Sequence, residues 1–213
     1  MIDKIFIINL EHRKDRKNQI LEQLNEQGIT NYEFFKGIIP SENDILNWNP
    51  NFCKDTNPLY VENYRKYIIG CLGCLLSHLV IMKISLSRGY ENILILEDDC
   101  VFEKKYSDML EIMKDFNKEY NLLYLSGSHL GEKIKITDNI YRITNTLTTG
   151  SYIVDKRVME YICDNIIGYK NPVDDFYSQI VQKKFDCYAF FPRITRQRDG
   201  YSDIQQKNTS YKL

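Results

Sequence analysis

Three acidic residues stand together directly after an apolar run. Glu97, Asp98 and Asp99 follow residues 92–96, Asn-Ile-Leu-Ile-Leu. Such a run is typical of a strand covered on both faces, and open α/β sheets bind ligands beyond the carboxyl ends of their strands. Adjacent carboxylates repel one another unless they face solvent or share a hard cation such as Mg²⁺ or Mn²⁺ with substrate phosphates. The pattern indicates either an exposed acidic turn or a metal and phosphate site, and we favour the second.

Two other classes of protein place aspartates directly after a strand, and neither fits this chain. Receiver domains are shorter and carry their acid pair after the first strand. Phosphatases of the haloacid dehalogenase type need Asp-x-Asp-x-Thr or Asp-x-Asp-x-Val, a spacing that residues 98–101, Asp-Asp-Cys-Val, do not offer. The acids therefore favour a transferase that binds a nucleotide.

A second polar group follows the first strand-like run of the chain. Asn9 and Leu10 end this run, and Arg13 and Arg16 come at the start of a helical pattern. The loop after the first strand is the usual place for nucleotide contacts in such sheets, and arginine binds phosphate through two parallel hydrogen bonds. Alternatively, residues 11–17 form only the solvated opening of a helix, and for Arg16 the two interpretations are equally good.

Cys71, Cys74 and His78 fall along one stripe of a predicted helix. This stripe suggests zinc, but a structural zinc site closes with four ligands, and the sequence has no second Cys-x-x-Cys to complete it. We therefore expect small buried residues and, for all six cysteines, free thiols. His78 is either a ligand contact or a buried histidine that orders the backbone.

Two further motifs lie later in the chain. Asp174 and Asp175 open a predicted helix after Pro172, where a helix N-terminus stabilises negative charge and one acid can serve as the cap. Residues 148–151, Thr-Thr-Gly-Ser, form either a simple tight turn or a place where a sugar approaches the backbone closely. Neither motif identifies a function by itself.

Composition excludes several classes of protein. Lys and Arg total 28 against 29 Asp and Glu, so the chain lacks the positive field of a protein that binds nucleic acid. Apolar residues make up 43% of the sequence and charged residues 27%, as in ordinary globular proteins. The apolar run at residues 5–8 is too short for a signal peptide or a transmembrane segment, which predicts a cytoplasmic protein without a membrane span.

Hydrophobic periodicity predicts strands that alternate with helices. Strands are expected at 3–9, 32–39, 92–96, 122–125, 140–143, 149–154 and 187–191, and helices at 13–27, 70–86, 104–119, 156–165 and 173–184. This alternation indicates an α/β fold with a mainly parallel sheet flanked by helices. We expect one domain over residues 1–213, with variable acceptor-side segments at 40–66 and 130–146.

The motifs together resemble glycosyltransferase family 25, which contains lipopolysaccharide-biosynthesis galactosyltransferases and procollagen galactosyltransferases. The resemblance covers nearly the whole chain and keeps the order of the family's motifs. It rests on residues 7–10 with Arg13 and Arg16, on Gly70-x-x-Gly73-Cys74-x-x-Ser77-His78, on 96–99, on 149–152, on 172–174 and on 202–204. Membership of this family would imply a GT-A-type, Rossmann-like nucleotide-sugar domain and transfer of the sugar with inversion.

The resemblance implies roles for particular residues. Asp99 is the principal ligand of Mn²⁺ or Mg²⁺, and Glu97 helps to hold the metal. The donor is implied to be UDP-galactose or UDP-glucose. It would contact Asn9, Leu10, Arg13, Arg16, Ser77, His78, Glu97, Asp98 and Gly150. Gln197 and residues 202–204 match the closing segment of the family and form either a lid or a disordered tail.

The resemblance also implies a catalytic base and an acceptor class. Asp174 would accept the proton of the attacking hydroxyl, with Asp175 as the near alternative and Asp203 as a third. Relatives use saccharide or hydroxylysine-containing acceptors. Two other functions remain open, a catalytically inactive nucleotide-sugar-binding or scaffold protein of the same fold, and a nucleotidyltransferase. The second usually opens with a Gly-rich basic loop that residues 9–13 do not supply.

Overall fold

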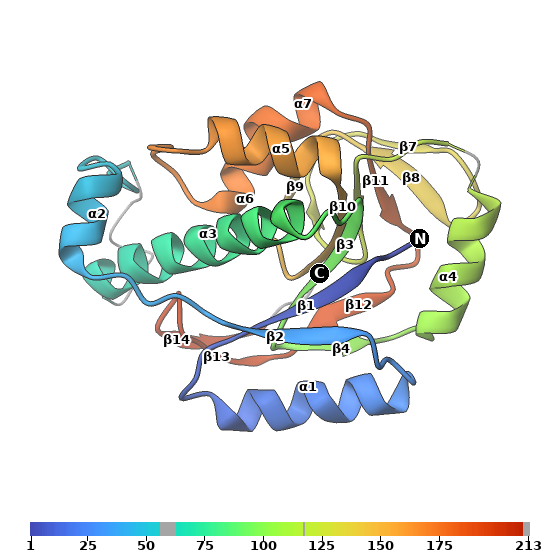
Figure 1. Cartoon of the computed structure of the whole chain (residues 1–213), viewed down its shortest axis with the longest axis horizontal. Helices are drawn as coiled ribbons and strands as arrows, with labels where there is room; N and C mark the ends of the chain where they lie inside the picture. The colour runs from blue at the N-terminus through green and yellow to red at the C-terminus, as the bar shows by residue number, and fades with distance from the viewer. Residues whose placement is uncertain (56–62, 117, 211–213) are drawn as a thin grey trace.

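The computed structural model describes residues 1–55, 63–116 and 118–210, which form a layered α/β structure around one large sheet (Figure 1). This sheet has eight strands in the order β2-β1-β3-β10-β5-β11-β8-β7. Their bounds are β1 Lys4–Asn9, β2 Tyr32–Lys36, β3 Asn92–Glu97, β5 Leu122–Tyr124, β7 Lys133–Lys135, β8 Ile140–Ile143, β10 Ser151–Asp155 and β11 Cys187–Phe190. The α/β architecture expected from the sequence is confirmed.

The sheet contains both parallel and antiparallel strand pairs. β1 pairs in parallel with β2 and β3, and β5 pairs in parallel with β11. β10 and β8 run against the direction shared by the other strands. Ser151 lies opposite Leu96, so residues that precede β10 reach the sheet edge where β3 ends.

Helices cover both faces of the sheet (Figure 1). The helices are α1 Lys14–Glu26, α2 Glu42–Trp48, α3 Tyr64–Ser87, α4 Tyr106–Asp115, α5 Lys156–Asn165, α6 Val173–Phe176 and α7 Gln182–Lys184, with a π-helical turn at Tyr177–Val181. Alternate residues of β3 pack into two different hydrophobic cores, one on each face of the sheet. Ile93 and Ile95 pack with the α3 and α5 side, and Leu94 and Leu96 pack with the α1 and α4 side.

Three small two-stranded pairings complete the described structure. β12 Thr195–Gln197 pairs with β4 Cys100–Phe102, β13 Gly200–Ser202 with β14 Lys207–Thr209, and β6 Ser128–His129 with β9 Thr146–Leu147. The β4 and β12 pair follows directly on the acidic turn after β3. It therefore brings the C-terminal part of the chain to that turn.

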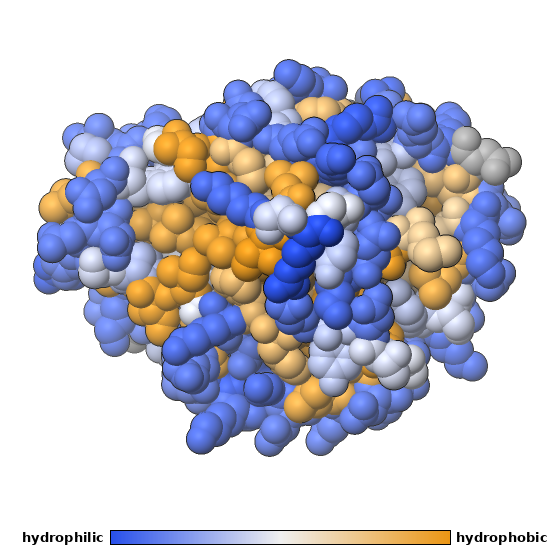
Figure 2. Space-filling model, in the orientation of Figure 1, coloured by the Kyte–Doolittle hydropathy of each residue, from blue (hydrophilic) through white to orange (hydrophobic). Residues whose placement is uncertain are grey.

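Helix α3 is the longest helix of the described residues and begins earlier than the expected residue 70. Asn63 caps its start, because its side chain accepts a hydrogen bond from the backbone N–H of Lys66. By length and composition α3 is apolar enough to cross a membrane, but 56% of its most apolar window is buried within the fold, as in a core helix. Figure 2 shows apolar side chains gathered on the face of the molecule over α3.

The loop after β2 lies against α3 at Gly73. A Cβ atom at this position would lie 2.4 Å from the carbonyl oxygen of Ile38, far inside contact distance, so only glycine fits. The segment 40–66, expected to vary, contains α2, which begins with a capping box formed by Ser41 and Asp44. Residues 56–62 of this segment lie outside the described residues.

Candidate active site

A cavity of about 580 Å³ opens at the sheet edge where β1 and β3 end. Its walls come from residues of α3, from the loop after β2, from the turn before β10, from the start of α6 and from the C-terminal residues 197–206. The volume is within the range of small-molecule sites. The edge is the one at which open α/β sheets bind ligands.

Arg16 and Asn9 hold Asp98 on one side of this cavity. Nη1 of Arg16 donates a hydrogen bond to Oδ1 of Asp98 at 2.9 Å, and Nδ2 of Asn9 donates to Oδ2 at 2.8 Å. Burial raises the pKa of Asp98, and Arg16 opposes that rise. Because both oxygens of Asp98 already have partners, this acid is less available to a bound ion than its neighbour Asp99.

Asp99 has an oxygen without a partner. Its side chain is 6% exposed, and Oδ1 is buried without a hydrogen-bond partner among the described residues. Burial, followed by repulsion from Glu97, raises the pKa of Asp99 to about 7, although Arg16 opposes the rise. A buried carboxylate oxygen without a partner is costly, and a cation beside it would remove that cost.

Gln197, whose side chain contacts Asp99, carries a second unpartnered oxygen. Its amide lies close enough to the Asp99 carboxylate to lower the pKa of that acid, and its Oε1 is buried without a partner among the described residues. Carboxylate and amide oxygens are the donors preferred by hard divalent cations. The chemistry of these two oxygens therefore fits a hard divalent cation such as Mn²⁺ or Mg²⁺, which Asp99 and Gln197 would hold.

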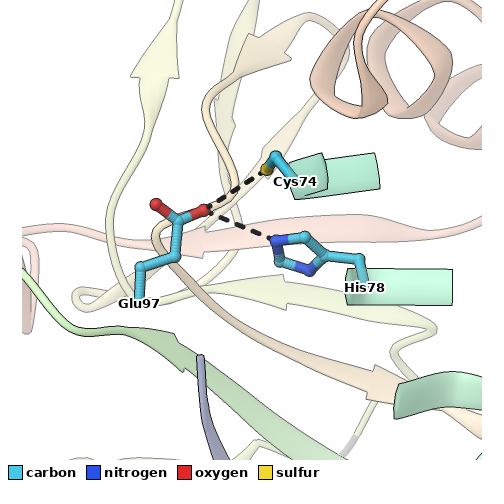
Figure 3. A group of neighbouring side chains, drawn as sticks. All are labelled: Cys74, His78 and Glu97. Atoms are coloured by element: carbon cyan, nitrogen blue, oxygen red, sulfur yellow. Dashed lines mark hydrogen bonds and ion pairs between the residues drawn. The ribbon is translucent and has the colours of Figure 1, made fainter. Parts of the chain in front are cut away.

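The side chain of Glu97 points toward Cys74 and His78 of α3 (Figure 3). Its Oε1 atom accepts a hydrogen bond from Oγ1 of Thr149 at 3.2 Å and lies 3.4 Å from Nε2 of His78. Its backbone N–H donates to the carbonyl of Gly150 at 2.8 Å. The three consecutive acids all line the cavity but have different hydrogen-bond partners.

The two acids at the start of α6 also differ. Asp174 lines the cavity and accepts hydrogen bonds from the backbone N–H groups of Thr148, at 3.2 Å, and of Asp175, at 3.0 Å. Burial raises its pKa, which strengthens it as a proton acceptor. Asp175 accepts hydrogen bonds from Tyr169 at 2.6 Å and Asn171 at 2.9 Å and is not among the residues that line the cavity.

The remaining predicted residues are divided between the cavity and its supports. Leu10, Arg16, Ser77 and His78 line the cavity, whereas Asn9, Arg13 and Gly150 lie behind it. Ser77 donates to the carbonyl of Gly73 and accepts from the N–H of Ile38, so it orders the backbone. The side chain of His78 is 1% exposed, which fits a buried, ordering histidine better than a direct donor contact.

The C-terminal segment forms part of the cavity wall. Arg13 forms an ion pair with Asp203, and Nη2 of Arg16 donates to the carbonyl of Tyr201 at 2.7 Å. Residues 202–206 line the cavity, and these contacts attach them to the loop after β1. The segment expected to be either a lid or a disordered tail is thus placed against the cavity in this structure.

Several cavity residues, and the roles of two supporting tyrosines, were not identified from the sequence. Lys66 and Tyr67 line the cavity, and Tyr152 and Tyr177 support His78 from behind. Tyr67 lies one helical turn before the predicted stripe of Cys71, so an earlier helix start would have included it. Nothing in the sequence relates the two supporting tyrosines, because they meet only in the folded chain.

Comparison with known proteins gives a family match. The model described as Glycosyltransferase family 25 (LPS biosynthesis protein) matches residues 2–177. Procollagen galactosyltransferase 2 from Mus musculus is 29% identical over 188 residues, which cover 82% of this chain and 29% of the relative. Putative glycosyltransferase R655 from Acanthamoeba polyphaga mimivirus is 28% identical over 179 residues, covering 76% of this chain and 52% of the relative.

A further human relative is named inactive glycosyltransferase 25 family member 3. It is 32% identical over 131 residues, which cover 58% of this chain and 21% of the relative. This chain therefore spans only part of the length of the curated relatives that it matches, less than a third of the mouse protein.

Solved structures share the fold at low sequence identity. A197 from STIV has a TM-score of 0.53 and 12% identity, with 98% of this chain and 93% of that chain covered. The apo form of UDP-glucose pyrophosphorylase has a TM-score of 0.50 and 13% identity, with 93% and 92% covered. These likenesses support the GT-A-type fold expected from the sequence and carry no further information about activity.

Proposed function

Because this chain belongs to glycosyltransferase family 25, we propose that it transfers a hexose, galactose or glucose, from a UDP-sugar to an acceptor hydroxyl with inversion. The observation that carries the proposal is the pair of unpartnered oxygens on Asp99 and Gln197, buried in a cavity that Asp174 also lines. Asp99 and Gln197 would form a cation site, and Asp174 would be a base in the same cavity.

The diphosphate would bind at the end of the cavity near Asp99. Asp99 and Gln197 would hold the Mn²⁺ or Mg²⁺, which when bound neutralises the two phosphates and stabilises the departing UDP. Arg16 and Lys66 line the same cavity and place positive side chains within it. Arg16 is already fixed by Asp98, so its guanidinium is oriented before the donor arrives.

The sugar would lie between the metal ligands and Asp174. Inverting transfer needs a base on the acceptor side, because the acceptor hydroxyl loses its proton as it attacks the anomeric carbon. The two backbone N–H groups that bind Asp174 fix the direction of its carboxylate. Asp174 therefore serves as the base in this proposal. Glu97 accepts a hydrogen bond from a hydroxyl group of the transferred sugar.

The acceptor is proposed only as a class. The matched relatives include proteins named procollagen galactosyltransferase, which favours the hydroxyl of a saccharide or of a hydroxylysine-containing chain. The description of the matched family also names lipopolysaccharide biosynthesis, which favours a saccharide as the acceptor. A free hydroxyl group is the feature that both acceptors share.

Thermal unfolding with a panel of nucleotide sugars and Mn²⁺ tests the donor assignment. A ligand that binds only the folded state raises the melting temperature, so UDP-galactose, UDP-glucose and UDP should each raise it more than GDP-mannose or CMP-sugars. A larger shift with GDP-mannose would contradict the proposal.

Product analysis then separates the proposed enzyme from its two alternatives. A transferase supplied with UDP-galactose releases UDP as it transfers galactose to an added acceptor or, slowly, to water. An inactive binding protein shows the thermal shift without release of UDP. A nucleotidyltransferase, when supplied with UTP and a sugar 1-phosphate, forms pyrophosphate instead.

A further inference from the structure

The three consecutive acids at the end of β3 contact two different groups of partners. Asp98 and Asp99 lie toward Arg16, at 2.9 Å and 3.5 Å from its Nη1 atom. Glu97 lies toward Cys74 and His78 of α3 (Figure 3). The contacts of the Glu97 carboxylate with Cys74, His78 and Thr149 all end on Oε1. No hydrogen bond from the described part of the chain reaches Oε2. One oxygen of Glu97 is therefore held, and the other is available to a ligand.

A buried chain of side-chain contacts holds His78 beside Glu97. Nδ1 of His78 lies 2.7 Å from the hydroxyl of Tyr152, which lies 2.9 Å from the hydroxyl of Tyr177. The His78 ring also stacks on the Tyr152 ring, with centroids 5.6 Å apart. Both tyrosines are fully buried. These groups have little freedom to turn, so they fix the ring that faces Glu97.

Glu97 selects one direction of donation along this chain. If Nε2 of His78 carries the proton, it donates to Glu97, Nδ1 accepts from Tyr152, and Tyr152 accepts from Tyr177. In the other neutral tautomer, the lone pair of Nε2 would face a carboxylate oxygen only 3.4 Å away, and the two would repel each other. The first arrangement satisfies every group in the chain.

We propose that His78 is a positioning residue that donates from Nε2 to Oε1 of Glu97 and so directs Oε2 at a hydroxyl group of the bound sugar. Tyr152 and Tyr177 set the tautomer that makes this donation. The inference rests on the proposed function in one respect, because it takes the group bound by Glu97 to be the sugar of the donor. The tautomer itself is a property of the protein without any ligand.

A metal ion bound by Cys74, His78 and Glu97 is the rival explanation. The three ligand atoms lie within 4.8 Å of one another, and His78 is supported through its other ring nitrogen, as metal-bound histidines are. Only three ligand atoms of the described residues meet here, whereas a structural zinc site closes with four ligands. The direct contact of His78 with Glu97 needs no ion.

Nitrogen-15 NMR of the imidazole rings in nucleotide-free protein tests the tautomer. The chain has three histidines, and the signals that disappear in His78→Gln belong to His78. The proposal predicts that Nε2 carries the proton and that metal analysis finds no zinc. A proton on Nδ1, or about one zinc per chain that Cys74→Ala removes, would overturn it whether or not the protein transfers sugar.

Kinetics with the UDP-hexose test the positioning role. His78→Leu should lower kcat/KM by about 10- to 100-fold, as loss of a supporting partner commonly does, while the affinity for UDP in Mn²⁺ changes by less than about threefold. His78→Gln keeps a donor at the end of its side chain and should recover part of the loss. Tyr152→Phe keeps the ring and provides a second, gentler variant, expected to lose about 3- to 10-fold.

The double variant His78→Leu with Glu97→Gln gives the decisive comparison. If His78 acts through Glu97, the double variant is no worse than Glu97→Gln alone, because the second change removes nothing further. Losses that multiply, or a His78→Leu protein with wild-type kcat/KM, would overturn the proposal. Wild-type protein that fails to bind UDP would instead contradict the proposed function and leave the NMR result standing.

Discussion

The guanidinium of Arg16 and the carboxylate of Asp98 join the first turn of α1 to the turn after β3, with Nη1 and Oδ1 2.9 Å apart. The pair is largely buried, with side chains 14% and 9% exposed. Arg16 also forms an ion pair with Asp99 at 3.5 Å, so one arginine faces both buried acids in the ligand-free protein. The ligand-free fold therefore depends on Arg16.

Arg16→Gln should lower the free energy of unfolding by about 3 kcal/mol, because it leaves two buried acids without their cation. Urea unfolding of ligand-free protein measures the loss. Lys114→Gln is the control, since it removes an exposed ion pair with Glu111 and should cost less than about 1 kcal/mol. Equal losses for the two variants would show that Arg16 is not a structural cation.

Asp174→Asn should keep UDP affinity and reduce transfer by about two to four orders of magnitude, the usual contribution of a general base. The matched control is Asp175→Asn, whose carboxylate binds Tyr169 and Asn171 outside the cavity. We expect that variant to lose thermal stability more than transfer activity. Normal transfer by Asp174→Asn together with inactivity of Asp175→Asn would reverse the assignment.

Gly73→Ala should destabilise the protein by about 1–3 kcal/mol, although alanine favours helix, because its methyl group would meet the carbonyl of Ile38 at 2.4 Å. Ser87→Ala, at the exposed end of α3, should change the stability by less than about 0.5 kcal/mol. Urea unfolding compares them. A stabilised Gly73→Ala protein would mean that the loop after β2 is not held against α3.

His129 should make the folded state sensitive to acid. Burial, and then Lys133, lowers the pKa of His129 to about 4, whereas an unfolded histidine titrates near 6.5. Between these values the unfolded state binds more protons, so this contribution to stability is complete above about pH 6.5 and is lost as the pH falls through about 4.

Unfolding at pH 7 and at pH 5 measures this effect. The wild type should lose about 1–2 kcal/mol more on this change than His129→Gln does. His12→Gln serves as the control, because the His12 side chain is 58% exposed. The same loss in wild type and in His129→Gln would assign the acid sensitivity to other groups.

Much of the fold is readable from local pattern. The helix expected at 156–165 is observed as α5 with those bounds, and the expected strand at 92–96 is β3 with one more residue. The start of α3 was misplaced by six residues because it depends on the Asn63 cap and not on apolar periodicity. In 173–184 the expected helix contains a π-helical turn, which periodicity does not reveal.

The candidate site was predictable in position but not in arrangement. The sequence places Glu97, Asp98 and Asp99 at a strand end, and this alone locates the cavity. Which way each acid turns depends on partners far along the chain, such as Arg16 for Asp98 and His78 for Glu97. Those contacts form only when α1 and α3 pack on opposite faces of the sheet.

Titration calorimetry of UDP with and without Mn²⁺, on wild type and on Asp99→Asn, tests the central claim most directly. A cation held by Asp99 screens the diphosphate from the acids, so Mn²⁺ should raise wild-type UDP affinity by about 10- to 100-fold or more. Asp99→Asn should stay folded and lose most of this enhancement. Asp108→Asn, at an exposed position of α4, should keep it. An Asp99→Asn protein with the same Mn²⁺ enhancement as wild type would contradict the assignment of the metal site.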